Sequence, residues 1–238
     1  MLPETLDALP TDDPRAVRSR GDLRRIHVAM GTTGMLARAL RGALPPSSGR
    51  PLRVLEIGAG DGLQMLAVAG RLAPQWPTVD LTLLDRQPVV AAPTLAAFAR
   101  LGWTAQSRVA DVFDWAADDR EGDAAGEHWD AVVAVLFLHH FTDVPLARQL
   151  GAVAARCDVF LACEPRRGRL PLLASRLVGL LGANAVTRED AVLSVRAGFC
   201  GAELSALWPG DASEWTLDEG AAGPFSHTFL AVRRSPER

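Results

Sequence analysis

One stretch, VLEIGAGDG at residues 54–62, constrains the fold of this chain more than any other. It begins as a short, mostly apolar strand and continues at once into the alternate glycines Gly58, Gly60 and Gly62. Glycine lets a backbone turn tightly and approach a ligand where a Cβ atom would collide. The stretch therefore predicts a buried strand that leads into a ligand-binding turn, with a helix behind it.

The glycine spacing separates two classes of ligand. A dinucleotide fingerprint, G-x-G-x-x-G, would need a third glycine at position 63, which is Leu63. The chain instead has an acidic residue, Glu56, two positions before Gly58. This pattern resembles motif I of the class I S-adenosylmethionine (AdoMet)-dependent methyltransferases. The resemblance implies that the turn wraps the amino-acid end of AdoMet.

Strands and helices alternate after the glycine turn. The strand segments are almost purely apolar, which is typical of a parallel sheet covered on both faces. We expect strands at 53–57, 79–84, 105–109, 130–136 and 159–163, helices at 63–72, 89–100 and 144–156, a surface loop at 116–128, a helix starting at 187, and a terminal hairpin at 214–219 and 225–233.

The resemblance implies an α/β, Rossmann-like, seven-stranded and mostly parallel sheet with a terminal antiparallel hairpin and an N-terminal helical lid. We therefore divide the chain into a helical cap and linker over 1–49 and a methyltransferase domain over 50–238. A helical insertion is expected around 166–187, and residues 1–20 are expected to be only partly ordered.

Composition excludes several kinds of chemistry and partner. The net charge of −3 gives no basic field for nucleic acid. The chain has no lysine and no tyrosine, so a Schiff base and a tyrosyl acid or base are excluded. Its apolar runs are too short to span a membrane. Its three cysteines are odd in number and form no C-x-x-C pair. We expect a cytoplasmic protein with reduced cysteines.

Ligands of open α/β sheets bind beyond the carboxyl ends of the strands, so the residue after each strand is a candidate. Asp85 follows the second strand and can accept the ribose hydroxyls, although a helix N-cap is the alternative. Arg86 is expected to cover the adenine. By resemblance, Asp111 meets the adenine amino group and Val112 packs on the ring, with Asp114 as a competing choice. The resemblance thus implies a cofactor-binding set of Glu56, Gly58, Ala59, Gly60, Gly62, Asp85, Arg86, Asp111, Val112 and Leu136.

The sequence LFLHHF at residues 136–141 follows the fourth strand, where the resemblance places the acceptor beside the AdoMet sulfonium. A histidine here can act as a general base because its pKa lies near neutrality. We favour His140 over His139, and a purely structural role is the alternative. No metal is expected, because two adjacent histidines without further ligands nearby do not make a zinc site.

Two more residues complete the candidate catalytic set. Glu164 follows the fifth strand and, with Arg166, is expected at the rim of the pocket, where the two either orient an acceptor or pair with each other. His27 lies in an N-terminal helix, which the resemblance implies is part of the lid over the cofactor. The catalytic candidates are therefore His140, His139, Glu164 and His27.

The carboxyl-terminal segments 184–199 and 203–209 resemble bacterial methyltransferases found beside type III polyketide synthases. That resemblance implies a small aromatic or lipid-like acceptor and O-methylation of a phenolic hydroxyl. C-methylation of a quinone-like or polyketide ring is the close rival. A non-catalytic AdoMet-binding module and a dinucleotide-dependent oxidoreductase are the alternatives from other classes, and a homodimer is left open.

Overall fold

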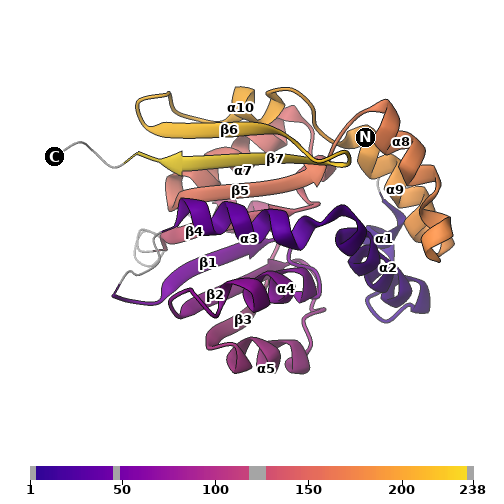
Figure 1. Cartoon of the computed structure of the whole chain (residues 1–238), viewed down its shortest axis with the longest axis horizontal. Coiled ribbons are helices and arrows are strands. Elements are labelled where there is room, and N and C mark those ends of the chain that lie inside the picture. The colour runs from indigo at the N-terminus through magenta and orange to yellow at the C-terminus, as the bar shows by residue number, and fades with distance from the viewer. Residues whose placement is uncertain (1–3, 45–48, 118–126, 235–238) are drawn as a thin grey trace.

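A seven-stranded sheet runs through the centre of the molecule (Figure 1). The computed structural model describes residues 4–44, 49–117 and 127–234. The strand order is β3-β2-β1-β4-β5-β7-β6. The strands are β1 (Leu52–Ile57), β2 (Val79–Asp85), β3 (Trp103–Val109), β4 (Trp129–Val135), β5 (Cys157–Pro165), β6 (Trp215–Ala222) and β7 (Ser226–Arg233). The first five strands pair in parallel, and β7 pairs antiparallel with both β5 and β6. The predicted α/β sheet with a terminal hairpin is confirmed.

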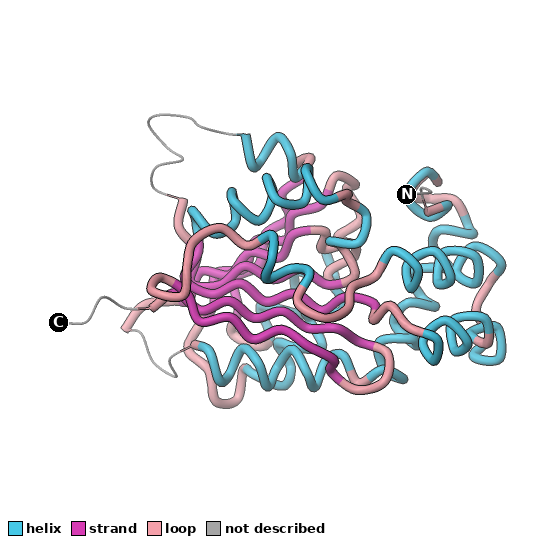
Figure 2. The backbone as a smooth tube through the Cα atoms, turned by 90° about the horizontal axis from the view of Figure 1, so that it is seen from above, coloured by secondary structure: helices cyan, strands magenta, loops and turns pink. Residues whose placement is uncertain are grey.

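Helices lie on both sides of the sheet, as Figure 2 shows. An apolar cluster packs between the helices and the sheet on each face. One face packs against α3 (Thr32–Ala43), α4 (Leu63–Leu72) and α5 (Ala92–Arg100). The other face packs against α6 (Val112–Ala117), α7 (Asp143–Arg156) and α10 (Glu203–Leu207). Helices on both faces explain why the inner strands are apolar at almost every position rather than at alternate ones.

The remaining helices form a cap at one end of the sheet (Figures 1 and 2). They are α1 (Thr5–Ala8), α2 (Pro14–Met30), α8 (Arg169–Arg176), the 3-10 helix η3 (Val178–Leu181) and α9 (Ala185–Ala197). Two buried carboxylates tie the N-terminal helices to the later insertion. Asp190 accepts hydrogen bonds from the backbone N–H groups of Thr5 and Leu6 at 2.8 and 2.9 Å. Asp22 accepts one from the N–H of Asn184 at 2.7 Å.

Two helices begin at residues that differ from the sequence prediction. The α2 helix begins at Pro14, in a segment expected to be only partly ordered, because the Asp13 side chain accepts a hydrogen bond from the N–H of Arg15. It ends where Gly31 adopts a left-handed conformation (φ 69°). The α5 helix begins at Ala92 rather than 89, with Pro93 in its first turn.

Two short helices, α6 and α10, were not predicted, because fewer than two turns show no clear periodicity. Parts of the predicted linker and of the predicted loop, residues 45–48 and 118–126, lie outside the described residues. Among the described helices, none combines the length and apolarity required to cross a bilayer.

Candidate active site

A cavity of about 320 Å³ lies between the carboxyl ends of β1, β2 and β4 and the helices α1 and α2 of the cap. Most of the predicted site residues line it: Glu56, Gly58, Ala59, Gly60, Asp85, Arg86, Asp111, Val112, Leu136, His139, His140 and His27. Two do not, Gly62 and Glu164. The topology therefore brings residues from five separate segments of the chain to one place.

Gly58 and Gly60 in the glycine turn require glycine for different physical reasons. Gly58 has φ 68°, and a Cβ atom there would lie 2.2 Å from the ring of Phe137. Gly60 has φ 54° and lines the cavity, where no other described heavy atom lies within 4 Å of an added Cβ. Gly58 thus lets the strand ends approach each other, whereas Gly60 leaves space for a ligand. Gly62 packs against Leu83 instead of the cavity.

Glu56 is a buried carboxyl group at the floor of the cavity. It is 2% exposed, and its Oε2 atom has no hydrogen-bond partner among the described residues. Burial raises the pKa of Glu56 well above its usual value, and the negative charges of Asp61 and Asp85 raise it further. A cationic ligand placed against Glu56 would offset the free-energy cost of ionising this buried carboxyl group, so the site favours a positive group.

Two carboxylates lie at the carboxyl ends of β2 and β3. Asp85 accepts hydrogen bonds from the N–H of Gly60 at 2.8 Å and from the N–H of Gln87 at 2.9 Å. One bond on each oxygen leaves both oxygens with a free lone pair for a hydroxyl donor. Asp111 is exposed and accepts from the N–H of Phe113 at 2.7 Å. Asp85 thus braces the glycine turn while it faces the cavity.

The α1 helix is held against the cavity mouth by Arg86. Its guanidinium donates a hydrogen bond to the backbone oxygen of Asp7 at 2.7 Å and lies 3.7 Å from the Asp7 carboxylate. Asp7 also lies 3.4 Å from Nδ1 of His140. Arg86, predicted as an adenine cover, therefore connects the strand end to the cap in this structure.

The turn after β4 is strained and lined by aromatic rings. Leu136 has φ 51°, a left-handed conformation that costs a non-glycine residue about 1–3 kcal/mol. The 3-10 helix η2 (Leu138–His140) follows and presents both histidines. Phe141 packs edge-on against Phe137 and Phe113, with centroids 5.1 and 5.3 Å apart. All three rings line the cavity, which is therefore shaped for an apolar or aromatic ligand at this end.

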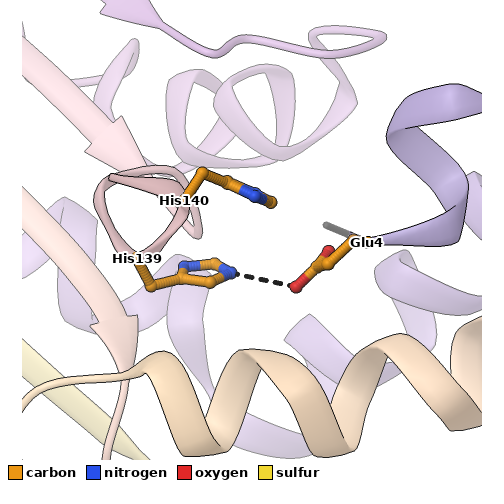
Figure 3. A group of neighbouring side chains, drawn as sticks. All are labelled: Glu4, His139 and His140. Atoms are coloured by element: carbon orange, nitrogen blue, oxygen red, sulfur yellow. Dashed lines mark hydrogen bonds and ion pairs between the residues drawn. The ribbon is translucent and has the colours of Figure 1, made fainter. Parts of the chain in front are cut away.

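A chain of buried hydrogen bonds fixes His139. Glu164 has no exposed surface and accepts from the N–H groups of Phe137 and Leu138 at 3.0 and 2.9 Å. Its second oxygen lies 2.7 Å from Nδ1 of His139, whose Nε2 lies 3.2 Å from Glu4 (Figure 3). Burial lowers the pKa of His139, but the bonds and charges of Glu164 and Glu4 outweigh it and raise that pKa to about 9. Glu164 was expected at the pocket rim, and it lies behind His139 instead.

His140 lies in a different environment from its neighbour. Its side chain is 22% exposed and lines the cavity, with its ring centroid 6.4 Å from that of Phe137. Both histidine rings extend from η2 toward the side where Glu4 lies, and their centroids are 4.4 Å apart (Figure 3). Both histidines line the cavity, and His140 is the more exposed of the two.

His27 enters the cavity wall from the last turn of α2. It is 7% exposed, and Nδ1 has no partner among the described residues. Burial lowers the pKa of His27 to about 4, so this imidazole is neutral near pH 7. As predicted from the lid hypothesis, the N-terminal helices line the cavity, but His27 is buried in its wall.

Sequence reasoning missed the acidic residues of the N-terminal segment. Glu4 and Asp7 contact His139 and His140, which lie more than 130 positions later in the chain. No local pattern marks them, because their position depends on the contacts between α1 and α9. The aromatic residues Phe113 and Phe141 were also missed, although both stand next to predicted site residues.

A comparison with known protein families identifies the family of this chain. A family model described as "methyltransferase domain" matches residues 32–166, which is more than half of the 238-residue chain. The chain belongs to this family. The methyltransferase match spans α3 to the end of β5 and includes the glycine turn, Asp85 and both cavity histidines. A comparison with curated proteins gives no match.

Solved structures resemble this methyltransferase along most of its length. An O-methyltransferase family protein from Burkholderia thailandensis has a TM-score of 0.60 at 16% identity, over 95% of this chain and 62% of the other. The plantazolicin methyltransferase BpumL in complex with SAH has a TM-score of 0.62 at 12% identity, over 94% and 92%. The mitomycin 7-O-methyltransferase MmcR has a TM-score of 0.57 at 20% identity, over 97% and 60%.

At these low identities, the TM-scores show a shared fold. This methyltransferase spans less than two thirds of the length of the Burkholderia protein and of MmcR, but most of BpumL. SAH, the demethylated form of AdoMet, in the BpumL structure is consistent with AdoMet as the methyl donor of this fold.

Proposed function

We propose that this methyltransferase transfers a methyl group from AdoMet to a hydroxyl oxygen of a small aromatic acceptor, of phenolic or polyketide type. The observation that carries the proposal is the position of His140. Its imidazole reaches the cavity beside three phenylalanine rings, at the end of β4 next to the glycine turn.

The residues at the glycine turn fit AdoMet. Glu56 is a buried carboxyl with an unpartnered oxygen and a raised pKa, which is the environment that a cationic amino group would complete. Gly60 leaves the space beside the turn open. We therefore assign Glu56, Gly58, Ala59 and Gly60 to the methionine end of the cofactor.

The nucleoside end is assigned to the next two strand ends. Asp85 can accept the ribose hydroxyls on the free lone pairs of its oxygens. Asp111 is exposed at the cavity and can accept a hydrogen bond from the adenine amino group, with Val112 against the ring. Arg86 is assigned to closing α1 over this end rather than to stacking on adenine, because of its bond to Asp7.

AdoMet supplies an activated methyl group on its sulfonium, so the protein need only position the acceptor, exclude water and remove one proton. His140 is the proposed base: a ring nitrogen accepts the hydroxyl proton as the oxygen gains the methyl group. Asp7, 3.4 Å from Nδ1, stabilises the imidazolium that forms. The phenylalanine rings hold the aromatic acceptor and exclude water.

His139 is a positioning residue in this proposal. Its pKa of about 9 means that the ring is already protonated at neutral pH and cannot accept a further proton. Its bonds to Glu164 and Glu4 fix η2 and connect it to the cap. Glu164 orients His139 and the backbone of η2, so it too acts through its neighbours.

The proposal is tested with AdoMet carrying a labelled methyl carbon and a panel of resorcinol-type phenols with and without alkyl chains. We expect the label in a methoxy group, located by NMR, and turnover only of those phenols that carry a free hydroxyl group. Label on a ring carbon would replace O-methylation by C-methylation. SAH binding without turnover of any acceptor would favour a non-catalytic AdoMet-binding module. Binding of NAD but not SAH would overturn the cofactor assignment.

A further inference from the structure

Three side chains at the acceptor end of the cavity form a cluster whose combination of ligand atoms the proposed methyl transfer does not explain. Glu4 comes from the N-terminal segment, and His139 and His140 come from η2 (Figure 3). One ligand atom from each of the three lies within 4.8 Å of the others. The expectation of no metal depended on two histidines having no further ligand nearby, and the fold brings one from 135 positions away.

The spacing within the cluster suits a metal ion as well as a proton. Ligand atoms bound to a tetrahedral zinc at about 2.0–2.1 Å stand roughly 3.3 Å apart. Nε2 of His139 and Oε1 of Glu4 are 3.2 Å apart. A zinc ion could therefore take the place of the bridging proton with little movement of either side chain.

The surroundings of His139 are those of a metal-ligating histidine. Ligating imidazoles commonly donate their other ring N–H to a carboxylate, which fixes the ring and its tautomer. Glu164 occupies that position at 2.7 Å from Nδ1, has no exposed surface and is itself held by two backbone N–H groups. Nε2 is thereby directed at Glu4 and the cavity. Asp7, 3.4 Å from His140, offers a further oxygen ligand or a charge partner.

We propose that Glu4, His139 and His140 bind a divalent first-row cation such as Zn²⁺, and that the bound cation inhibits methyl transfer. Two imidazoles and a carboxylate are ligands that zinc prefers. Binding releases the proton on Nε2 of His139 to solvent. The cation binds a ring nitrogen of His140 and so withdraws this side chain from its role as the base, and it joins the N-terminal segment to η2. The inhibition, though not the binding, rests on the proposed role of His140 as the base.

Metal binding is measured directly on the full chain by competition between the protein and a chromophoric zinc chelator, and by the absorption spectrum of bound Co²⁺. We expect one ion per chain. Glu4→Gln, His139→Asn and His140→Asn should each weaken zinc binding by at least about 10-fold, the lower end of the loss seen when even an outer-shell partner is removed. Glu4→Gln is the most informative variant, because Glu4 is outside the sheet and its loss leaves both histidines in place.

Three variants serve as controls and should bind zinc as the wild type does. Glu189→Gln removes an exposed carboxylate on α9, His128→Asn removes an exposed histidine paired with Asp158, and Cys200→Ser removes a half-buried thiol. None of these residues lines the cavity. Zinc binding that is lost in a control, or that is unchanged in all three cluster variants, would overturn the site.

Activity then tests the inhibition. Zinc should lower the initial rate of the wild type, and a chelator should restore it. Glu4→Gln should need about 10-fold more zinc for the same fractional loss, measured against its own zinc-free rate. SAH titration on the same samples separates the two proposals. SAH binding without zinc binding overturns the metal site alone, and cluster-dependent zinc binding without SAH binding supports the metal site while the proposed function fails.

Discussion

The two ends of the cavity are built in different ways. At the cofactor end, the glycine turn follows β1, Asp85 ends β2, and Asp111 stands two residues after β3. Backbone N–H groups donate hydrogen bonds to both carboxylates. At the acceptor end, the histidines on η2 meet Glu4 and Asp7 from the N-terminal segment, more than 130 positions earlier in the chain. The first end is part of the sheet, whereas the second is complete only when the cap is in place.

This difference separates two functions of the same cavity. The cofactor end has a buried carboxyl group and turns fixed by positive φ angles, so it is organised before a ligand arrives. The acceptor end depends on α1, a single turn of helix held by Asp190 and Arg86. We therefore expect changes at one end to affect binding of the cofactor, and changes at the other to affect turnover.

The largest expected effect separates the two ends most clearly. His140→Asn removes the proposed base, and loss of general base catalysis typically costs about 100- to 10,000-fold in rate. Steady-state kinetics should show this loss in kcat, while calorimetry shows SAH affinity within about 2-fold of wild type, since bonds at the cofactor end are untouched. His128→Asn, a change of the same type at an exposed site, should leave both unchanged. An active His140→Asn enzyme would exclude His140 as the base.

The converse change lies at the cofactor end. Asp85→Asn keeps the size of the side chain but removes the charge that would accept the ribose hydroxyls. Losing hydrogen bonds to a charged group should weaken SAH binding by about 10- to 100-fold, measured by calorimetry. Asp80→Asn, at an exposed position of the same strand, is the matched control. Equal SAH affinity in wild type and Asp85→Asn would leave Asp85 with only its role of bracing Gly60.

The residues of the cofactor end were also the ones that the sequence predicted best. Glu56, the glycine turn, Asp85 and Asp111 lie at or shortly after the ends of predicted strands, so locating the strands locates them. The same logic placed His139 and His140 in the cavity wall. It failed for Glu164, because strand β5 continues to Pro165 and carries Glu164 into the core instead of the rim.

Contacts between distant segments account for what the sequence did not reveal. Glu4 and Asp7 reach the histidines only because Asp190 of α9 binds the start of α1. That contact joins residues more than 180 positions apart, and no periodicity or spacing within either segment records it. The same holds for Arg86. Its place next to Asp85 suggested a contact with the ligand, but its guanidinium binds the backbone oxygen of Asp7 in the cap.

A third change tests whether the two ends are mechanically joined. Gly58→Ala would place a Cβ atom 2.2 Å from the Phe137 ring, at a backbone φ of 68°. Overpacking and strain of this kind cost about 1–3 kcal/mol, which should appear as a lower Tm and as weaker SAH binding. Because Phe137 belongs to the acceptor end, kcat should fall as well. Gly70→Ala is the control, since its Cβ meets no described atom within 4 Å inside α4, and alanine there should preserve or raise the Tm. A change confined to SAH binding would mean that Phe137 adjusts and the two ends are independent.

The smallest expected effect concerns pH and belongs to the acceptor end alone. The pKa of His139 is about 9 in the folded protein and about 6.5 in an unfolded chain, so folding favours the protonated ring. A raised pKa gives stability that is fully present below about pH 6.5 and lost as the pH rises through about 9. Between pH 7 and 9, the free energy of unfolding measured with urea should fall on the order of 1–2 kcal/mol in the wild type and in His128→Asn, but not in His139→Gln.

Glu4→Gln should reduce this pH dependence without abolishing it, because Glu164 still holds Nδ1 of His139. Wild type and His139→Gln with the same dependence on pH would show that His139 is not held protonated, and His139 would then compete with His140 for the role of base.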